Sequence, residues 1–468
     1  MAALGARYTQ PYMEGHVSRR SLILMARAPP RSSLASALAA ATPALLTDSP
    51  WPPPHAAAHW TPADLPRTLD PVRVVPRSGP LFSLHSWHAD LNLASHNAET
   101  PGGFEAIWTD SAEIEARTMQ TDDFFRDGSA RHFYSGALLD AEGMPPPSLS
   151  PLEPLLEVLN NASDRSVNLK AWFGSAGAHT PLHYDSMDNV YLQMHGEKIF
   201  ELLPPEALDH TVHLFPRIHP LSHFARPRSG DAAGSSEDHP TAGQRVDAVE
   251  AFVAFDATTH STVDGRREAM RVRLSAGDVL YIPPFWAHAA LCERACIAAN
   301  VWVSSQAMHA VNTLEQLPLP FESHWSVEQT TRATLLFLRW LLRGSEESAT
   351  HYEYCAPIER LLDTRWRNAH AELFVSRREE AADSVRVAAA AECSPQTAHD
   401  GLTAAELLKL RTYAERRAAV LATIDARIRP TLLADQIERV AHWATGGAAI
   451  ATHALLLRLG ECCATPLA

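Results

Sequence analysis

The chain has 468 residues, 46% of them hydrophobic, which excludes a disordered protein and allows one large catalytic unit with an appended region. Forty Lys and Arg residues against 54 Asp and Glu residues give a formal net charge of −14, which disfavours nucleic acid as a partner because no global positive field attracts phosphate. No apolar stretch reaches the roughly 18 residues that span a bilayer, so we expect a soluble protein.

The N-terminus and the cysteines bear on the compartment. The first 45 residues contain five arginines and a single acid, Glu14, a composition that suits an organellar transit peptide and equally a disordered arm. The six cysteines show neither CxxC nor zinc-finger spacing, so a reducing compartment is the simpler interpretation. We expect an intracellular protein of the cytoplasm or nucleus, or of an organelle if residues 1–45 are a transit peptide.

Residues 46–150 are predicted to form an α/β lead-in, and a β pattern follows. Strands at 190–194 and 198–203, separated by a turn centred on Gly196, predict a hairpin. Residues 226–247 are rich in Gly, Ser, Asp and Pro without periodicity, so they are expected to be an exposed insertion.

The β pattern resumes at 270–274, 279–282 and 295–303. Short antiparallel strands at this spacing indicate a barrel or jelly roll. We therefore expect a mainly β fold with α elements, in which residues 151–310 form the catalytic core.

Residues 320–468 are predicted to form a C-terminal helical region. Ser326 and Gln329 have the spacing of a capping box, as do Thr403 and Glu406, so a helix is expected after each pair. The second helix carries an apolar stripe and is predicted to end at Pro430, before a third helical segment at about 432–443.

One short segment places two metal-ligating side chains together. In a strand, alternation points His183 and Asp185 to the same face. A third ligand completes the 2-His-1-carboxylate triad that holds non-haem Fe(II). His288 is the candidate, because Pro283 and Pro284 fix the chain shortly before it.

Two sequence pieces, TPLHYDSMDNVYLQMHGEKIFELLPP and GDVLYIPPFWAH with the following AANVW, resemble the two halves of a Jumonji-C (cupin-8) core. The resemblance is to the asparaginyl-hydroxylase-like branch and covers about residues 168–305. It implies a double-stranded β-helix and an Fe(II)- and 2-oxoglutarate-dependent dioxygenase, with iron held by the three residues named above.

The resemblance also implies the residues around the cosubstrate. Lys198 would pair with the distal carboxylate of 2-oxoglutarate and Thr180 would add a hydrogen bond, which is what a buried carboxylate requires. Further residues are expected to line the site or support the metal: Asn189, Asn300, Trp302 and Tyr134.

The resemblance implies hydroxylation of a protein side chain, with succinate and CO2 as co-products. A lysine demethylase, a tRNA-base hydroxylase and a catalytically silent Jumonji-C-like binding module are the alternatives, as is a cupin isomerase or epimerase with another metal. The C-terminal helices are either a structural cap or the interface of a homodimer. Neither the substrate nor the outcome of the reaction follows from the motif.

Overall fold

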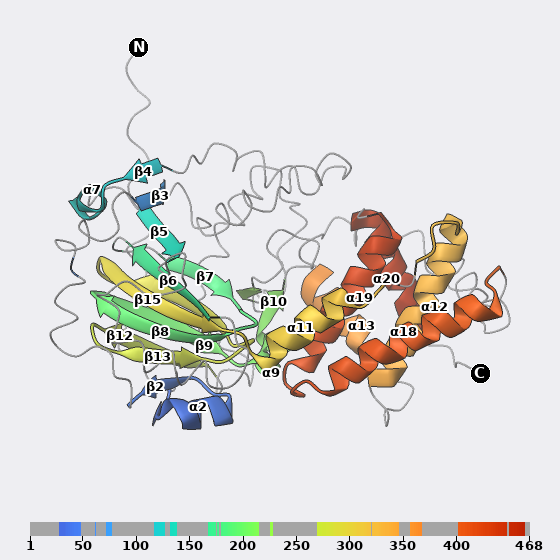
Figure 1. Cartoon of the computed structure of the whole chain (residues 1–468), viewed down its shortest axis with the longest axis horizontal. Coiled ribbons are helices and arrows are strands. Elements are labelled where there is room, and N and C mark those ends of the chain that lie inside the picture. Colours follow the sequence, from blue (N-terminus) through green and yellow to red (C-terminus); the bar gives the residue numbers. More distant parts are fainter. Residues whose placement is uncertain are drawn as a thin grey trace, which may run out of the picture.

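The computed structural model describes residues 28–47, 61, 72–76, 117–126, 132–137, 167–174, 176, 179–214, 225–227, 269–319, 321–345, 356–366, 401–446 and 449–463. Within them, two antiparallel-rich sheets stand beside a group of C-terminal helices (Figure 1). The expected insertion lies outside the described residues except for 226 and 227, and so does most of the lead-in.

The larger sheet has nine described strands in the order β1-β2-β13-β8-β15-β6-β5-β3-β4. One face is covered by short helices α2 and α7, whose Leu34, Ala37 and Phe124 join the apolar side chains of the central strands. The strands are β1 (Arg31–Ser32), β2 (Ala44–Leu46), β3 (Val72–Pro76), β4 (Arg117–Met119), β5 (His132–Ala137), β6 (Val167–Gly174), β8 (Asp188–His195), β13 (Val279–Ile282) and β15 (Cys296–Val303), and the helices are α2 (Leu34–Ala40) and α7 (Thr121–Arg126).

The smaller sheet has four described strands in the order β12-β9-β14-β7. Its inner side chains, among them Phe200, Leu202 and Val272, share one apolar cluster with Tyr191 and Leu280 of the larger sheet. The two sheets therefore enclose a common interior, and the expected β-rich jelly-roll core with helices is confirmed. The strands are β7 (His179–His183), β9 (Glu197–Leu203), β12 (Met270–Ser275) and β14 (Ala287–Cys292); a separate pair is formed by β10 (Val212–Leu214) and β11 (Ala225–Pro227).

The predicted hairpin at 190–203 is wrong. β8 pairs with β13 and β15 in the larger sheet, whereas β9 pairs with β12 and β14 in the smaller one. The chain crosses between the sheets at Gly196, where φ is +73° and an added Cβ would lie 2.1 Å from the Ala295 carbonyl oxygen. Both faces of β8 are buried, so its apolar pattern did not show which strand pairs with it.

Part of the expected N-terminal arm is folded onto the larger sheet. Ser33 caps α2, and β2 pairs with β13 through Leu45 and Ala44. The carbonyl of Ala41 also accepts a hydrogen bond from Trp286 Nε1 at 3.2 Å. Residues 28–47 thus form an edge of the larger sheet through β1 and β2, and buried apolar side chains of this segment pack into the core of that sheet.

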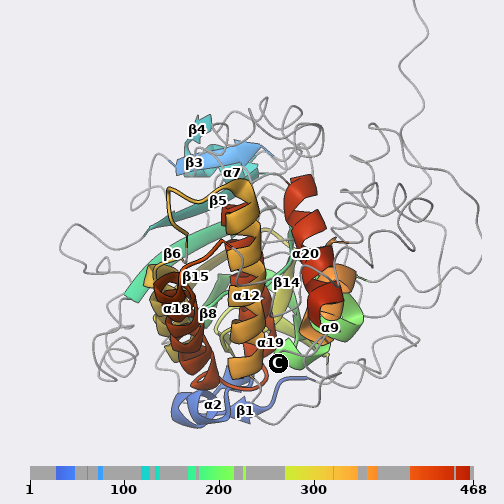
Figure 2. The same ribbon diagram turned by 90° about the vertical axis from the view of Figure 1, so that its right-hand side faces the viewer.

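The C-terminal helices stand beside the jelly roll and pack against the end of the smaller sheet where β7 and β9 finish and β14 begins (Figures 1 and 2). Leu182, Tyr184, Phe285 and Ala287 of the jelly roll belong to the same apolar core as the helices. The helical elements are α9 (Pro205–Thr211), α11 (Gln306–Gln316), α12 (Val327–Ser345), α13 (Ala356–Leu361), the π-helical turn η4 (Leu362–Trp366), α18 (Ala404–Ala422), α19 (Arg429–Ala444) and α20 (Ala449–Cys463).

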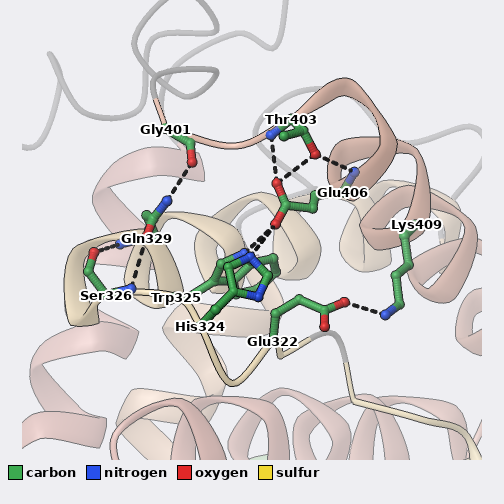
Figure 3. A network of polar contacts seen from close by, with 9 residues as sticks. All are labelled: Glu322, His324, Trp325, Ser326, Gln329, Gly401, Thr403, Glu406 and Lys409. Carbon is green, nitrogen blue, oxygen red and sulfur yellow. Dashed lines mark hydrogen bonds and ion pairs between the residues drawn. The ribbon is translucent and has the colours of Figure 1, made fainter.

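Both predicted capping boxes are present, and they interlock (Figure 3). Gln329 of the first box donates to the Gly401 carbonyl at 2.6 Å, just before the second box. Glu406 of the second box accepts from Trp325 Nε1 at 2.6 Å, just before the first. The two helix starts are therefore tied together, and hydrogen bonds led by those from Thr403 lower the pKa of Glu406 to about 2.

One sequence expectation in this region needs correction. The helix that begins after Thr403 ends at Ala422, and Pro430 lies in the first turn of α19 instead of ending the preceding helix. Proline suits that position because the first turn of a helix leaves its backbone N–H groups unpaired. No helix in the described ranges is long and apolar enough to span a bilayer.

The cysteine expectation also differs from the structure. Cys292 and Cys296 form a disulfide across the turn between β14 and β15, and both side chains are buried. Disulfides are rare in reducing compartments, so this bond runs against the simpler interpretation of the cysteine spacing.

Candidate metal centre

Three potential metal ligands meet on the inner face of the smaller sheet. His183 ends β7 and Asp185 follows two residues later, while His288 is opposite His183 on the neighbouring β14. One donor atom of each residue lies within 4.8 Å of the other two. His288 Nε2 is 3.8 Å from Asp185 Oδ2, and the two imidazole centroids are 4.3 Å apart.

The His288 ring is oriented by the backbone. Its Nδ1 lies 3.0 Å from the Trp286 carbonyl oxygen, so Nδ1–H donates there and Nε2 faces Asp185. Burial lowers the pKa of His288 to about 4, with His183 adding to the effect and Asp185 opposing it. The imidazole is therefore neutral, the form in which histidine binds metal.

Asp185 lies just beyond the end of β7 and is held by the loop that precedes His288. Its carbonyl accepts a hydrogen bond from the Phe285 N–H at 2.7 Å. Phe285 has a left-handed backbone with φ +63°, a conformation that costs free energy and needs support from its surroundings. On the other side, the Ser305 hydroxyl donates to the Ser186 carbonyl at 2.5 Å.

The donor set fits a divalent metal. Asp185 Oδ2 is buried and has no hydrogen-bond partner among the described residues. A buried carboxylate oxygen without a partner is costly, and coordination of a cation would remove that cost. Two imidazoles and one carboxylate are the ligands typical of non-haem Fe(II), and the described ranges contain no other cluster of this kind.

Lys198 is buried on β9 inside the barrel. Its Nζ is 5.0 Å from the centre of the Tyr191 ring, and no described carboxylate lies within ion-pair distance. Burial lowers the pKa of Lys198 to about 7. The Tyr191 hydroxyl is buried and has no hydrogen-bond partner in the described residues, and burial raises the pKa of this phenol. Together they offer a cation and a hydroxyl to an anionic ligand.

The side chains of Asn189 on β8 and Asn300 on β15 are hydrogen-bonded to each other. Asn300 Nδ2 donates to Asn189 Oδ1 at 3.3 Å, and Asn300 Oδ1 accepts from Trp172 Nε1 at 2.6 Å. Trp302 packs edge-on against Trp172, and its buried Nε1 has no partner within the described residues. Their predicted roles beside the cosubstrate stay predictions.

Thr180 and Tyr134 are placed less fully. Thr180 lies on β7 opposite Ala290, three residues before His183. Tyr134 lies on β5 opposite Phe173, and its side chain is outside the described part of the chain. The predicted contacts of both residues with 2-oxoglutarate remain predictions.

The sequence analysis did not identify Tyr191 or Trp172. The signal for Tyr191 was available, because alternation along β8 puts it on the same face as Asn189. Trp172 gave no such signal, since its partner Asn300 lies 128 residues further along the chain.

A jelly roll with a His-x-Asp…His cluster on its inner face defines a cupin-like domain with a candidate metal centre. The family model described as a cupin-like domain matches residues 109–308. Jumonji C domain-containing protein 5 of Drosophila melanogaster is 29% identical, over an alignment that covers 31% of this chain and 30% of that protein. The bifunctional peptidase and (3S)-lysyl hydroxylase JMJD7 of Homo sapiens is 26% identical, over 28% of this chain and 40% of that protein. Lysine-specific demethylase JMJ31 of Arabidopsis thaliana is 24% identical (38% and 27%).

Residues 109–308 thus match a cupin-like domain, and the similar proteins named above are members of the Jumonji-C family. Members of the family use Fe(II) and 2-oxoglutarate, and the donor set described above fits that metal. The matched part spans 27 to 40% of the length of these three relatives, so the resemblance concerns the domain and not the whole proteins.

Proposed function

We propose that this protein is an Fe(II)- and 2-oxoglutarate-dependent dioxygenase that hydroxylates a protein side chain and releases succinate and CO2. The observation that carries the proposal is the meeting of His183, Asp185 and His288, with the unpaired Asp185 Oδ2 directed at the same point. A catalytically silent module has no physical need for such an oxygen.

Each residue would have a defined task. His183, Asp185 and His288 would hold Fe(II) and leave coordination positions for cosubstrate and oxygen. The bound metal and 2-oxoglutarate supply the oxidising power that hydroxylates a C–H bond. The Trp286 carbonyl keeps His288 in the correct tautomer, which is the usual contribution of a group behind a ligand.

Lys198 and Tyr191 would bind the distal carboxylate of 2-oxoglutarate. A buried ammonium without a carboxylate partner is unfavourable, and an incoming carboxylate would restore its charge. Thr180 would add a hydrogen bond to the same group. The apolar interior around Phe200 and Leu202 would exclude water from the reacting centre.

The relatives support a protein substrate. A (3S)-lysyl hydroxylase and lysine-specific demethylases are among the similar proteins, so we propose a protein substrate and lysine as the first side chain to test. Hydroxylation would add one oxygen to a lysine peptide, whereas demethylation would release formaldehyde from a methylated one. Assembly of two chains through the C-terminal helices, and a compartment inside the cell, are retained as proposals.

The test is anaerobic addition of Fe(II) and then 2-oxoglutarate to the metal-free protein, followed by visible absorption. A charge-transfer band is expected for the wild type, none for Asp185→Ala, and a much higher requirement for 2-oxoglutarate in Lys198→Ala. His324→Ala, which changes an exposed histidine of the helical region, should keep the band. A folded wild-type protein that forms no band would exclude the dioxygenase and favour the binding module.

A further inference from the structure

The strand segment that carries the metal ligands has a second face, and that face belongs to the helical region. His183 and Asp185 point into the barrel, whereas Leu182 and Tyr184 point into the apolar core shared with the C-terminal helices. Tyr184 is buried and stacks on Phe285, with ring centroids 5.1 Å apart and planes at 23°. The residue between two metal ligands is thus enclosed by elements more than 100 residues distant in sequence.

A buried ionic network lies at that boundary. Arg365 Nη1 is 2.6 Å from both Asp435 Oδ1 and Glu438 Oε2, and Nη2 donates to the Thr431 carbonyl at 3.2 Å. Trp366 Nε1 donates to Glu438 at 2.6 Å. Because breaking a buried ion pair leaves an uncompensated charge, this network has little freedom to move.

Tyr184 belongs to the same apolar core as Trp366, the residue that follows Arg365 in η4. The η4 turn that carries Arg365 also lies against β10 of the jelly roll. Tyr184 therefore stacks on Phe285 and is part of the apolar core of the helical region.

We propose that Tyr184 is a positioning residue for the metal centre, through which the C-terminal helical region, tied together by the Arg365–Asp435–Glu438 network, fixes the placement of Asp185. The mechanical link is short, because Tyr184 stacks on Phe285 and Phe285 N–H holds the Asp185 carbonyl at 2.7 Å. Asp185 lies beyond the end of β7, so ladder hydrogen bonds do not hold it in place. This inference rests on the proposed metal centre and gives the helical region a role in it.

The test compares Tyr184→Leu, Tyr184→Phe and a control, Phe337→Leu. Phe337 is a buried aromatic of α12 in the same apolar core, and it lies in the helical region rather than at the metal ligands. Arg365 itself is left unchanged, because its replacement would leave two buried carboxylates without a cationic partner and could unfold the protein. Co(II) is titrated into each folded protein and followed by its d–d absorption, with melting temperature measured in parallel.

We expect both leucine variants to melt at lower temperature, but only Tyr184→Leu to bind Co(II) about tenfold more weakly and with altered d–d bands. Tyr184→Phe keeps the ring and loses only the hydroxyl, so a weakening smaller than that of Tyr184→Leu is expected. Wild-type affinity in Tyr184→Leu, or equal weakening in Phe337→Leu, would overturn the inference. If Tyr184→Leu does not fold, wild-type affinity in Tyr184→Phe overturns it. A wild type that binds no Co(II) would instead refute the metal centre.

Discussion

Binding of 2-oxoglutarate should depend on pH through Lys198. Burial lowers the pKa of the free ammonium to about 7. A bound carboxylate favours the charged form and returns the pKa towards the ordinary lysine value of about 10.4. Binding is therefore coupled to proton uptake: affinity is full below pH 7 and falls as the pH rises above it. The carboxylates of 2-oxoglutarate stay ionised throughout this range.

The size of the effect follows from the two pKa values. At pH 9, about 1% of the free protein carries a charged Lys198, so the affinity should be about a hundredfold lower than at pH 6, and it should fall nearly tenfold per pH unit above about pH 7. Calorimetry of 2-oxoglutarate binding to the Co(II)-loaded chain, in two buffers of different ionisation enthalpy, measures both the affinity and the proton taken up.

A matched variant isolates the lysine. Lys198→Arg keeps a permanent charge, so binding should lose its pH dependence even where the altered shape lowers the affinity. A wild-type affinity that stays constant from pH 6.5 to 9, or a pH dependence that persists in Lys198→Arg, would refute Lys198 as the cosubstrate's cation.

Three stability predictions concern other parts of the chain. Thr403→Ala removes a capping side chain and should lower the free energy of unfolding in urea by about 1 kcal/mol; no loss would mean that the interlocked box is redundant. Gly196→Ala would place a Cβ 2.1 Å from a backbone oxygen and should lower the free energy of unfolding by about 3 kcal/mol. In Gly446→Ala the added Cβ meets nothing within 4 Å, so the free energy of unfolding should fall by only about 1 to 2 kcal/mol. Replacing Cys292 and Cys296 by serine should cost about 2 kcal/mol, and a thiol reductant should bring the wild type down to that level; a reductant without effect would argue against the disulfide.

The cluster of candidate metal ligands could be predicted because its residues are local or lie in recognisable contexts. Alternation along one strand put His183 and Asp185 on the same face, and a strand ended by two prolines indicated His288. The capping boxes were predictable for the same reason, since each is encoded within four residues.

What the sequence did not reveal depends on long-range pairing. The strands on either side of Gly196 look like a hairpin, and only their partners in two different sheets show that the chain crosses the barrel. The contacts around Tyr184 were equally hidden, because its neighbour Phe285 is 101 residues further on and the helices that share its apolar core come later still. Apolar periodicity reports burial of a face but not the identity of the element that covers it.

The folded N-terminal segment sets a limit on proteolytic maturation. The Ala41 carbonyl accepts a hydrogen bond from Trp286, whose own carbonyl accepts one from the metal ligand candidate His288. A protease that removed a leader as far as residue 45 would cut away this support and leave the edge of β13 open to pairing with another chain. An intact edge of the larger sheet therefore requires the segment from β1, which begins at Arg31, through β2.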